Sequence, residues 1–242
     1  MVSVPIAAAE TGVSHKQNGA IGVDLNEHHI SFTHVNAKGN KVSSTDHTFT
    51  KPSYRDTSKQ AQTGLGEAVK GLLDAACRHK TPIIIEDLDF KKKRGAIKAG
   101  ENRVFNRTVS SLVTAKFLAL LTLRCAERGI ELIKVNPAYT SLIGRLKYAN
   151  QFNYNIHQAA AMVIARRGLG LSDRSMPKYV MCVVSNSLQY FGLPEDSPKM
   201  TIGEYFKKVR GSYDAWFSDI DWMLRAKRKS PPQHILQEDI NF

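Results

Sequence analysis

Ala20–Asn26 is a short apolar stretch that carries a single carboxylate. Ile21, Val23 and Leu25 alternate along it, and β-branched residues suit the pleated backbone of a strand, so the stretch predicts a buried strand. Asp24 should point to the face opposite Val23. Because a charge in such a strand is costly to bury without a partner, two interpretations stay open. Asp24 is either a strand-end residue that faces solvent or caps a turn, or a functional carboxylate.

Residues 81–88 repeat the pattern, because an apolar, β-branched run ends there in Glu86 and Asp87. Carboxylates that are brought together repel each other unless a cation lies between them, and Mg²⁺ and Mn²⁺ prefer oxygen ligands. Two such ions about 3.5–4 Å apart can activate a water and stabilise the leaving oxygen of a phosphodiester. The two segments together predict a metal-dependent nuclease on a mixed α/β sheet.

Strands and helices are expected to alternate along most of the chain. The strands are expected at 20–26, 29–36, 41–50, 83–87 and 130–135, and the helices at 57–80, 108–129 and 155–170. The first three strands suggest an antiparallel meander, and the later succession is typical of an α/β sheet with helices against it. We expect a flexible lead-in over residues 1–18, a main domain over 19–171 and a mostly helical extension over 172–242. Within the extension, 179–188 is apolar enough for a strand or a buried helix.

The chain has 242 residues and a net charge of +12. Such an excess favours a polyanionic partner, most often nucleic acid, although a basic solvated surface gives the same balance. The three cysteines are far apart and form no C-x-x-C pair, so neither a structural zinc nor a disulfide framework is expected. No apolar run is long enough to span a bilayer, and the first residues lack the basic region of a secretory signal. We expect a cytoplasmic protein without a membrane partner, associated with the nucleoid when it is bound to DNA.

The strongest run of positive charge directly follows Glu86. Residues 89–107 contain glycines and little apolar periodicity, which predicts an exposed loop at the rim of the site. A loop there is well placed to hold a phosphate backbone, and the alternative is a solvated basic loop. The residues of this segment expected to bind nucleic acid are Lys91, Lys92, Lys93, Arg94 and Arg103.

Two further polar features follow the strand that ends at Val135. Thr140 and Ser141 lie where α/β folds commonly place their sites, so their hydroxyls are candidates for phosphate contacts and equally for capping the next turn. His157 falls in the first turn of the alanine-rich helix. A neutral imidazole can ligate a metal or carry a proton, whereas an ordinary helix-terminal histidine is the plainer interpretation.

Three segments taken together resemble the RuvC-like nuclease part of transposon-encoded TnpB-like proteins, which are relatives of the type V CRISPR effectors. The segments are Gly22-Val23-Asp24-Leu25, Ile84-Ile85-Glu86-Asp87-Leu88 and the block from Pro137 to Gly170. The resemblance covers about residues 19–171, and the Thr-Ser pair and the Ala-Ala-x-x-Ile-x-Arg-Arg-Gly-Leu-Gly run strengthen it. It implies a ribonuclease-H-like (RuvC-like) mixed sheet flanked by helices. It also implies a transposase-related mobile-element protein that cleaves DNA with divalent metal under RNA guidance and takes part in DNA recombination.

The family carries three acidic positions, which fall here on Asp24, Glu86 and His157. The resemblance therefore implies that Asp24 and Glu86 are catalytic and bind Mg²⁺ or Mn²⁺, with His157 in place of the third acid. A histidine supplies one nitrogen ligand and no negative charge, so it either completes the metal site as ligand or base, or marks a weakened or inactive nuclease. Three other carboxylates could substitute without motif support: Asp87, Asp89 and Asp173.

Two parts of the family have no counterpart in this chain. No cysteine lies between Ser141 and His157, where relatives carry a four-cysteine zinc ribbon. Asp24 also lies too near Met1 for the N-terminal region that binds guide RNA and target DNA. These departures predict a fragment, a split protein or a degenerate copy, with DNA, a guide RNA, a separate N-terminal half or a second copy as partners.

The leading hypothesis from the sequence is a divalent-metal-dependent DNA endonuclease domain. Its first alternative is a catalytically inactive nucleic-acid-binding remnant or regulator, which would bind without cleaving. A third reading is a ribonuclease-H-like protein whose basic regions serve assembly alone.

Overall fold

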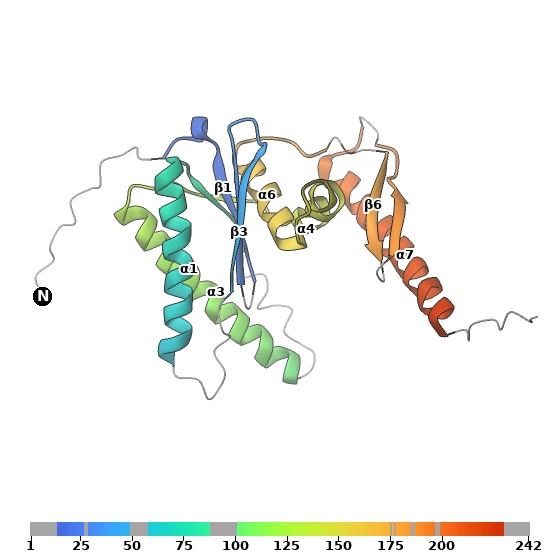
Figure 1. The fold of residues 1–242 in the computed structure, drawn as a ribbon, viewed down its shortest axis with the longest axis horizontal. Coiled ribbons are helices and arrows are strands. Elements are labelled where there is room, and N and C mark those ends of the chain that lie inside the picture. Colours follow the sequence, from blue (N-terminus) through green and yellow to red (C-terminus); the bar gives the residue numbers. More distant parts are fainter. Residues whose placement is uncertain are drawn as a thin grey trace, which may run out of the picture. The chain divides into compact units, whose positions relative to one another are not determined.

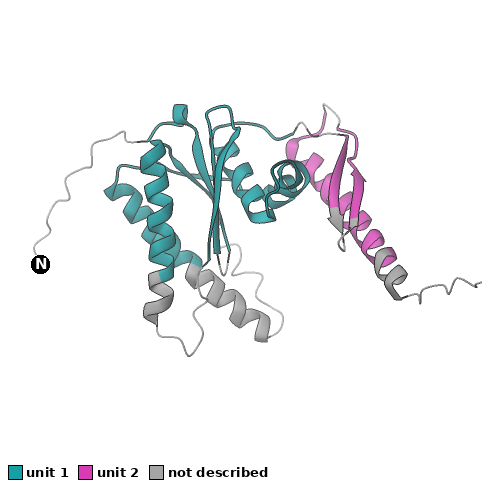
Figure 2. Ribbon diagram, viewed as in Figure 1, with its two compact units in different colours: residues 1–175 teal, residues 176–242 magenta. Residues whose placement is uncertain are grey.

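The computed structural model describes residues 14–26, 29–48, 58–87, 101–174, 176, 178–184, 187–196 and 199–229, with backbone alone for 58–63, 101–113, 183–184, 187 and 224–229. The chain divides into two compact units, Met1–Ser175 and Met176–Phe242 (Figure 2). The predicted contacts Lys91, Lys92, Lys93 and Arg94 lie outside the described residues, as do residues 1–13 of the expected lead-in.

Unit 1 contains the alternating strands and helices expected from the sequence (Figure 1). Its strands are β1 (Ala20–Leu25), β2 (His29–Val35), β3 (Lys41–Thr48), β4 (Ile83–Glu86) and β5 (Leu132–Val135). Its helices are α1 (Ser58–His79), α3 (Glu101–Glu127), α4 (Thr140–Ile143), α5 (Asn150–Phe152) and α6 (Ile156–Gly168), with a 3-10 turn η1 (Lys16–Asn18) and a π-helical segment η2 (Gly144–Ala149).

One expectation about local structure is wrong. Residues 101–107, expected to belong to an exposed basic loop, are helical, because α3 begins at Glu101 rather than at Thr108. The backbone of Arg103 therefore lies in α3, and its side chain lies outside the description.

The five strands form one mixed sheet in the order β3-β2-β1-β4-β5. β1, β2 and β3 pair as an antiparallel meander, whereas β4 pairs in parallel with both β1 and β5. The parallel pairs follow from the crossover helices α1 and α3, because parallel neighbours cannot be joined by a tight turn. A three-stranded meander continued by two parallel strands is the ribonuclease-H-like arrangement, so the predicted fold class is confirmed.

Different helices cover the two faces of this sheet (Figure 1). On one face, Ile21, Val23, Ile83 and Ile85 form a core with side chains of α1 and α3. The other face carries α6, which packs so closely that a Cβ on Gly22 would lie 2.0 Å from the carbonyl oxygen of Ala161. The alanines of α6 are fully buried, so this helix lies directly on the central strands.

Unit 2 consists of a β-hairpin and one long helix. β6 (Tyr179–Val184) and β7 (Ser187–Gly192) pair antiparallel, and α7 spans Ile202–Lys229. Phe191 of the hairpin is buried and packs edge-to-face on Tyr213 of α7, with ring centroids 5.4 Å apart. Of the two interpretations of 179–188 the strand is confirmed. No helix in the described part of the chain is long and apolar enough to cross a membrane.

Candidate active site

Asp24 and Glu86 lie at the carboxyl ends of neighbouring parallel strands. β1 and β4 pair Val23 with Ile85, so Asp24 and Glu86 are the next residues of the two strands. Side chains in register on neighbouring parallel strands point to the same face, with the strands about 4.8 Å apart. Gly22 lies two residues before Asp24 and faces α6, so both carboxylates belong to the α6 face. The sheet therefore brings together two residues that the sequence places far apart.

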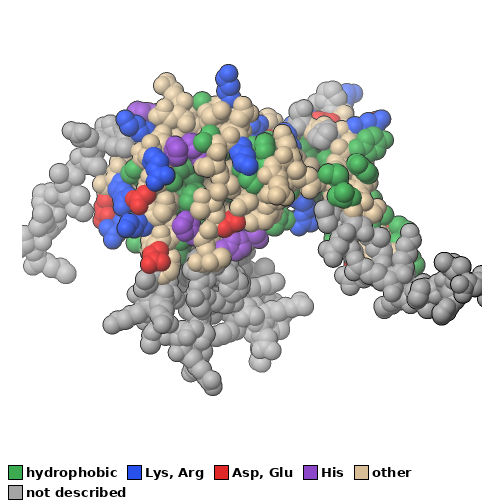
Figure 3. Space-filling model, in the orientation of Figure 1, with side chains coloured by type: hydrophobic (Ala, Val, Ile, Leu, Met, Phe, Trp, Pro, Cys, Tyr) green, Lys and Arg blue, Asp and Glu red, His purple; other side chains and the backbone are tan. Residues whose placement is uncertain are grey.

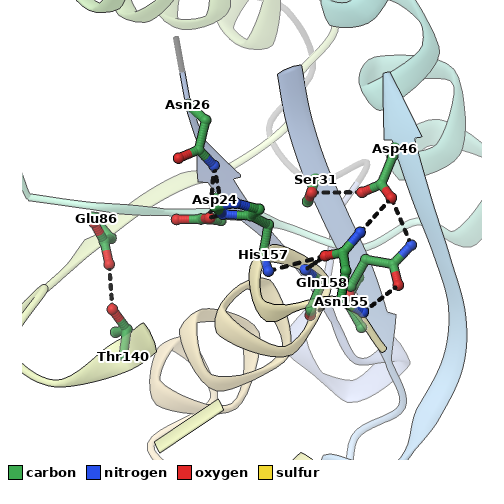
Figure 4. A network of polar contacts seen from close by, with 10 residues as sticks. Asp24, Asn26, Ser31, Asp46, Glu86, Thr140, Asn155, His157 and Gln158 are labelled. Carbon is green, nitrogen blue, oxygen red and sulfur yellow. Dashed lines mark hydrogen bonds and ion pairs between the residues drawn. The ribbon is translucent and has the colours of Figure 1, made fainter. Parts of the chain in front are cut away.

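His157 reaches the same place from the first turn of α6. Its Nδ1 lies 2.9 Å from Asp24 Oδ2, and Asn26 Nδ2 donates to the same oxygen at 2.9 Å (Figure 4). His29, at the start of β2, meets the His157 ring edge-on with centroids 4.5 Å apart. The Asp24 side chain is 12% exposed, whereas that of His157 is 35% exposed. A ligand arriving from solvent therefore has easier access to the imidazole than to the carboxylate.

His157 Nδ1 has two polar neighbours, Asp24 Oδ2 at 2.9 Å and Asn26 Nδ2 at 2.8 Å. A proton on Nδ1 suits the carboxylate, which accepts hydrogen bonds, whereas a lone pair on Nδ1 suits the amide, which donates them. When Nδ1 carries the proton, Nε2 has the free lone pair, and a neutral imidazole in this form binds a metal or accepts a proton. Carboxylate–histidine contacts of this kind orient the rings of catalytic and metal-binding histidines.

Glu86 is held by the segment that follows β5. Thr140 Oγ1 lies 2.5 Å from Glu86 Oε1 and 3.1 Å from the carbonyl oxygen of Pro137. Thr140 is only 2% exposed, and the left-handed backbone of Tyr139, with φ of +63°, turns the chain into α4 just before it. Thr140 and Ser141 are predicted either to contact nucleic acid or to cap this turn. The Thr140 hydroxyl is buried against a carboxylate, and Ser141 is exposed.

Arg167, in the last turn of α6, ties the same segment to this helix. Its guanidinium donates to the carbonyl oxygens of Asn136 and Ala138. Burial lowers the pKa of Arg167, and the negative charges of Asp173 and Glu86 act in the opposite direction. The two ends of α6 thus serve the site differently: His157 contacts Asp24 at one end, and Arg167 supports the segment that holds Glu86 at the other.

Asp173, a candidate substitute for the third acid, is a buried carboxylate surrounded by hydrogen-bond donors. It is 8% exposed and accepts hydrogen bonds from the Tyr148 hydroxyl at 2.5 Å, Arg166 Nε at 2.9 Å and Lys147 Nζ at 3.2 Å. Burial, followed by the hydrogen bond to Asp173, raises the pKa of the Tyr148 phenol. The charge of Asp173 is therefore compensated where it lies. Of the other two substitutes, Asp87 is exposed and Asp89 lies outside the described residues.

Several polar residues around the site were not singled out from the sequence. They are Asn26, Ser31, Asp46, Asn155 and Gln158, which are labelled in Figure 4, and His29 beside His157. One signal was available, since asparagine followed three residues later by glutamine is a helix-capping pattern, and the structure has that capping box at the start of α6. The contacts of Asp46 with this cap join segments that are distant in sequence, and no local pattern predicts them.

The site offers donor types that suit a divalent cation. Carboxylate oxygens are the ligands that Mg²⁺ and Mn²⁺ prefer, and imidazole nitrogen is a further competent ligand. Within the described ranges, no three His, Cys, Asp or Glu side chains are grouped so that they could hold a metal ion as they stand. The residues therefore fit a divalent cation in kind, with Asp24 and Glu86 as neighbouring oxygen donors and Nε2 of His157 as the available nitrogen.

No protein-family model matches this chain, and no curated protein matches it. Among solved structures, T. thermophilus RuvC in complex with Holliday junction substrate is similar to it with a TM-score of 0.40 and 13% sequence identity, over 60% of this chain and 89% of that chain. A likeness at this level carries no argument about function, and the ribonuclease-H-like assignment depends on the strand order itself.

Proposed function

We propose that unit 1 is a divalent-metal-dependent DNA endonuclease domain, related to the RuvC-like part of TnpB-like mobile-element proteins. The observation that carries the proposal is the position of Asp24 and Glu86, in register on one face of adjacent parallel strands with His157 against Asp24. Two carboxylates in such proximity favour a cation between them. Mg²⁺ or Mn²⁺ held by Asp24, Glu86 and His157 would supply an activated water and stabilisation of the leaving oxygen.

The protein's own residues have separable roles in this proposal. Asp24 accepts from His157 Nδ1, which leaves Nε2 to bind the cation or to accept a proton from the attacking water. Asn26 holds the Asp24 carboxylate in place, and Thr140 does the same for Glu86.

The DNA partner is proposed from charge. The net charge of +12 and the basic segment after Glu86 suit a phosphate backbone. On the face drawn in Figure 3, the Lys and Arg side chains of unit 1 are spread over several elements, with acidic side chains among them. We therefore assign the DNA contacts to the segment with Lys91, Lys92, Lys93 and Arg94 and to exposed Ser141. Guidance by RNA and a role in DNA recombination are the finer parts of this proposal, and they depend on the family resemblance alone.

A second candidate is a catalytically inactive nucleic-acid-binding remnant. Two observations favour it. The third acidic position of the family is a histidine, and Oδ2 of Asp24 is already engaged by Asn26 and His157. Such a protein would bind DNA or RNA in a salt-sensitive way and would not cleave it.

The test is cleavage of labelled single- and double-stranded DNA by the full chain with Mn²⁺, with Mg²⁺ and with chelator. The variants are Asp24→Asn, His157→Asp and, as a matched control outside the site, Asp74→Ala. Asp74 is an exposed carboxylate that pairs with Arg128 at 2.7 Å. We expect metal-dependent cleavage that falls by more than about 100-fold in Asp24→Asn and persists in Asp74→Ala.

Each other outcome selects an alternative. Equal cleavage by the parent and Asp24→Asn would overturn the assignment of the site. Cleavage by His157→Asp from an inactive parent would identify a nuclease disarmed at this one position. Salt-sensitive binding without cleavage in every variant would support the inactive remnant, and the absence of binding at low salt would remove nucleic acid as the partner.

A further inference from the structure

Asp46, on the edge strand β3, accepts three hydrogen bonds from side chains of two other elements. Its Oδ1 accepts from Ser31 Oγ at 2.5 Å, and its Oδ2 accepts from Asn155 Nδ2 and Gln158 Nε2, both at 2.8 Å (Figure 4). Hydrogen bonds to an ionised acceptor are stronger than those between neutral groups. A surface carboxylate with three such partners is therefore a fixed point between the sheet and the start of α6.

The two amides that Asp46 holds are the N-terminal cap of α6. Asn155 Oδ1 accepts from the backbone N–H groups of His157 at 2.9 Å and Gln158 at 2.8 Å, and Gln158 Oε1 accepts from Asn155 N at 3.3 Å. Each amide thus directs its oxygen to the helix backbone and its nitrogen to Asp46. A flipped amide would lose both kinds of contact, so the carboxylate determines the orientation of the cap.

The register of the sheet connects this cap to the candidate active site. Asp24 pairs with Ser31 across β1 and β2, and Ser31 pairs with Asp46 across β2 and β3. The three side chains therefore form one row on the α6 face. His157 lies over one end of this row and the cap of its own helix lies over the other.

We propose that Asp46 is a positioning residue that anchors the first turn of α6 and thereby keeps the His157 imidazole against Asp24. Helix ends fray unless their orphan N–H groups are held, and His157 is the second residue of α6. The proposal rests on the proposed function in that the Asp24–His157 pair is taken as the centre of the nuclease site. It adds a residue that neither touches substrate nor belongs to the family motif.

The test measures the cap directly in the full chain, without metal or substrate. Hydrogen exchange of the His157 and Gln158 amides reports whether Asn155 still accepts from them, and the ¹⁵N resonances of the His157 ring report its contact with Asp24. In Asp46→Ala we expect both amides to exchange about tenfold faster and the ring resonances to shift. In Asp74→Ala, which removes a carboxylate elsewhere, we expect neither change.

Two further variants separate anchoring from simple destabilisation. Asn155→Ser retains a capping oxygen but lacks the amide nitrogen that reaches Asp46. In a chain that already carries Asn155→Ser, Asp46→Ala should therefore accelerate amide exchange less than it does in the parent. Asp46→Asn keeps the size of the side chain and one acceptor oxygen, and we expect an intermediate exchange rate. If Asp46→Ala does not fold, Asp46→Asn still tests whether Asp46 anchors the first turn of α6.

Cleavage kinetics complete the test. If the parent cleaves DNA, Asp46→Ala should lower kcat about tenfold with little change in KM, because the phosphate contacts are elsewhere. A silent parent would count against the proposed function, whereas exchange rates would still decide the role of Asp46. Unchanged exchange and unchanged ring resonances in both Asp46→Ala and Asp46→Asn would overturn the proposal, whatever the cleavage result.

Discussion

Gly22→Ala gives the sharpest test of how α6 is seated on the sheet. The added Cβ would lie 2.0 Å from the carbonyl oxygen of Ala161 and 2.4 Å from the backbone nitrogen of Ala165, whereas ordinary contact begins near 3.4 Å. Both neighbours are helix backbone, so no flexible side chain can move aside. α6 would have to recede locally by roughly 1–1.5 Å. Overpacking a core typically costs 1–3 kcal/mol, and we expect about 3 kcal/mol here because backbone meets backbone.

Urea unfolding followed by far-UV circular dichroism measures this loss. Trp216 and Trp222 are the chain's two tryptophans and both lie in α7 of unit 2, so their fluorescence reports the unfolding of unit 2 separately. Gly66→Ala is the matched control. Among the described residues, no atom beyond the adjoining helix backbone lies within 4 Å of the Cβ that it adds to α1, so it should raise the free energy of unfolding by up to about 1 kcal/mol. A Gly22→Ala protein within 0.5 kcal/mol of the parent would refute this account of the packing.

Two predictions concern buried titratable groups. Burial, followed by the charge of neighbouring His79, lowers the pKa of His34 from 6.5 to about 4. Because the pKa of His34 is lower in the folded chain than in the unfolded chain, neutral His34 makes its full contribution to stability above about pH 6.5. As the pH falls toward 4 this contribution is lost, and the free energy of unfolding decreases by about 3 kcal/mol. Unfolding midpoints across this range should show the loss in the parent and a flatter profile in His34→Leu. Burial also raises the pKa of the Cys125 thiol to about 12, so iodoacetamide at pH 8 should alkylate partly exposed Cys77 first; rapid labelling of Cys125 in the folded chain would contradict this.

Hydrophobic periodicity predicted most of unit 1, because its strands and helices are bounded by turn residues. The pairing of Asp24 with Glu86 could be anticipated, since carboxyl ends of parallel strands meet at one edge of a sheet. The start of α3 was missed because glycine and lysine nearby suggested a loop, whereas Glu101 initiates a helix. Composition alone distinguishes a charged loop from the charged first turns of a helix only weakly.

The contacts that surround the site are harder to predict from the sequence than its central residues. The contact of Thr140 with Glu86 and that of Asp46 with the α6 cap depend on how distant segments cross in space. Hydroxyl, amide and carboxylate side chains are common in turns and on surfaces, so nothing local distinguishes one that supports a site. The sequence indicates which side chains could bind the metal, whereas the contacts that hold these side chains in place can be found only in the folded structure.

The edge strand β3 carries a consequence for folding fidelity. Its side chains are mostly exposed, so hydrophobic burial does little to choose between its possible alignments with β2, although a slip of one residue would turn every side chain to the other face. Polar pairs make that choice instead, through Ser31 with Asp46 and Thr33 with Ser44. In a misaligned chain Asp46 would face away from α6 and the helix cap would lose its anchor. The first turn of α6 would therefore be anchored only in molecules whose outermost strand has paired correctly, even though the hydrophobic core could form without it.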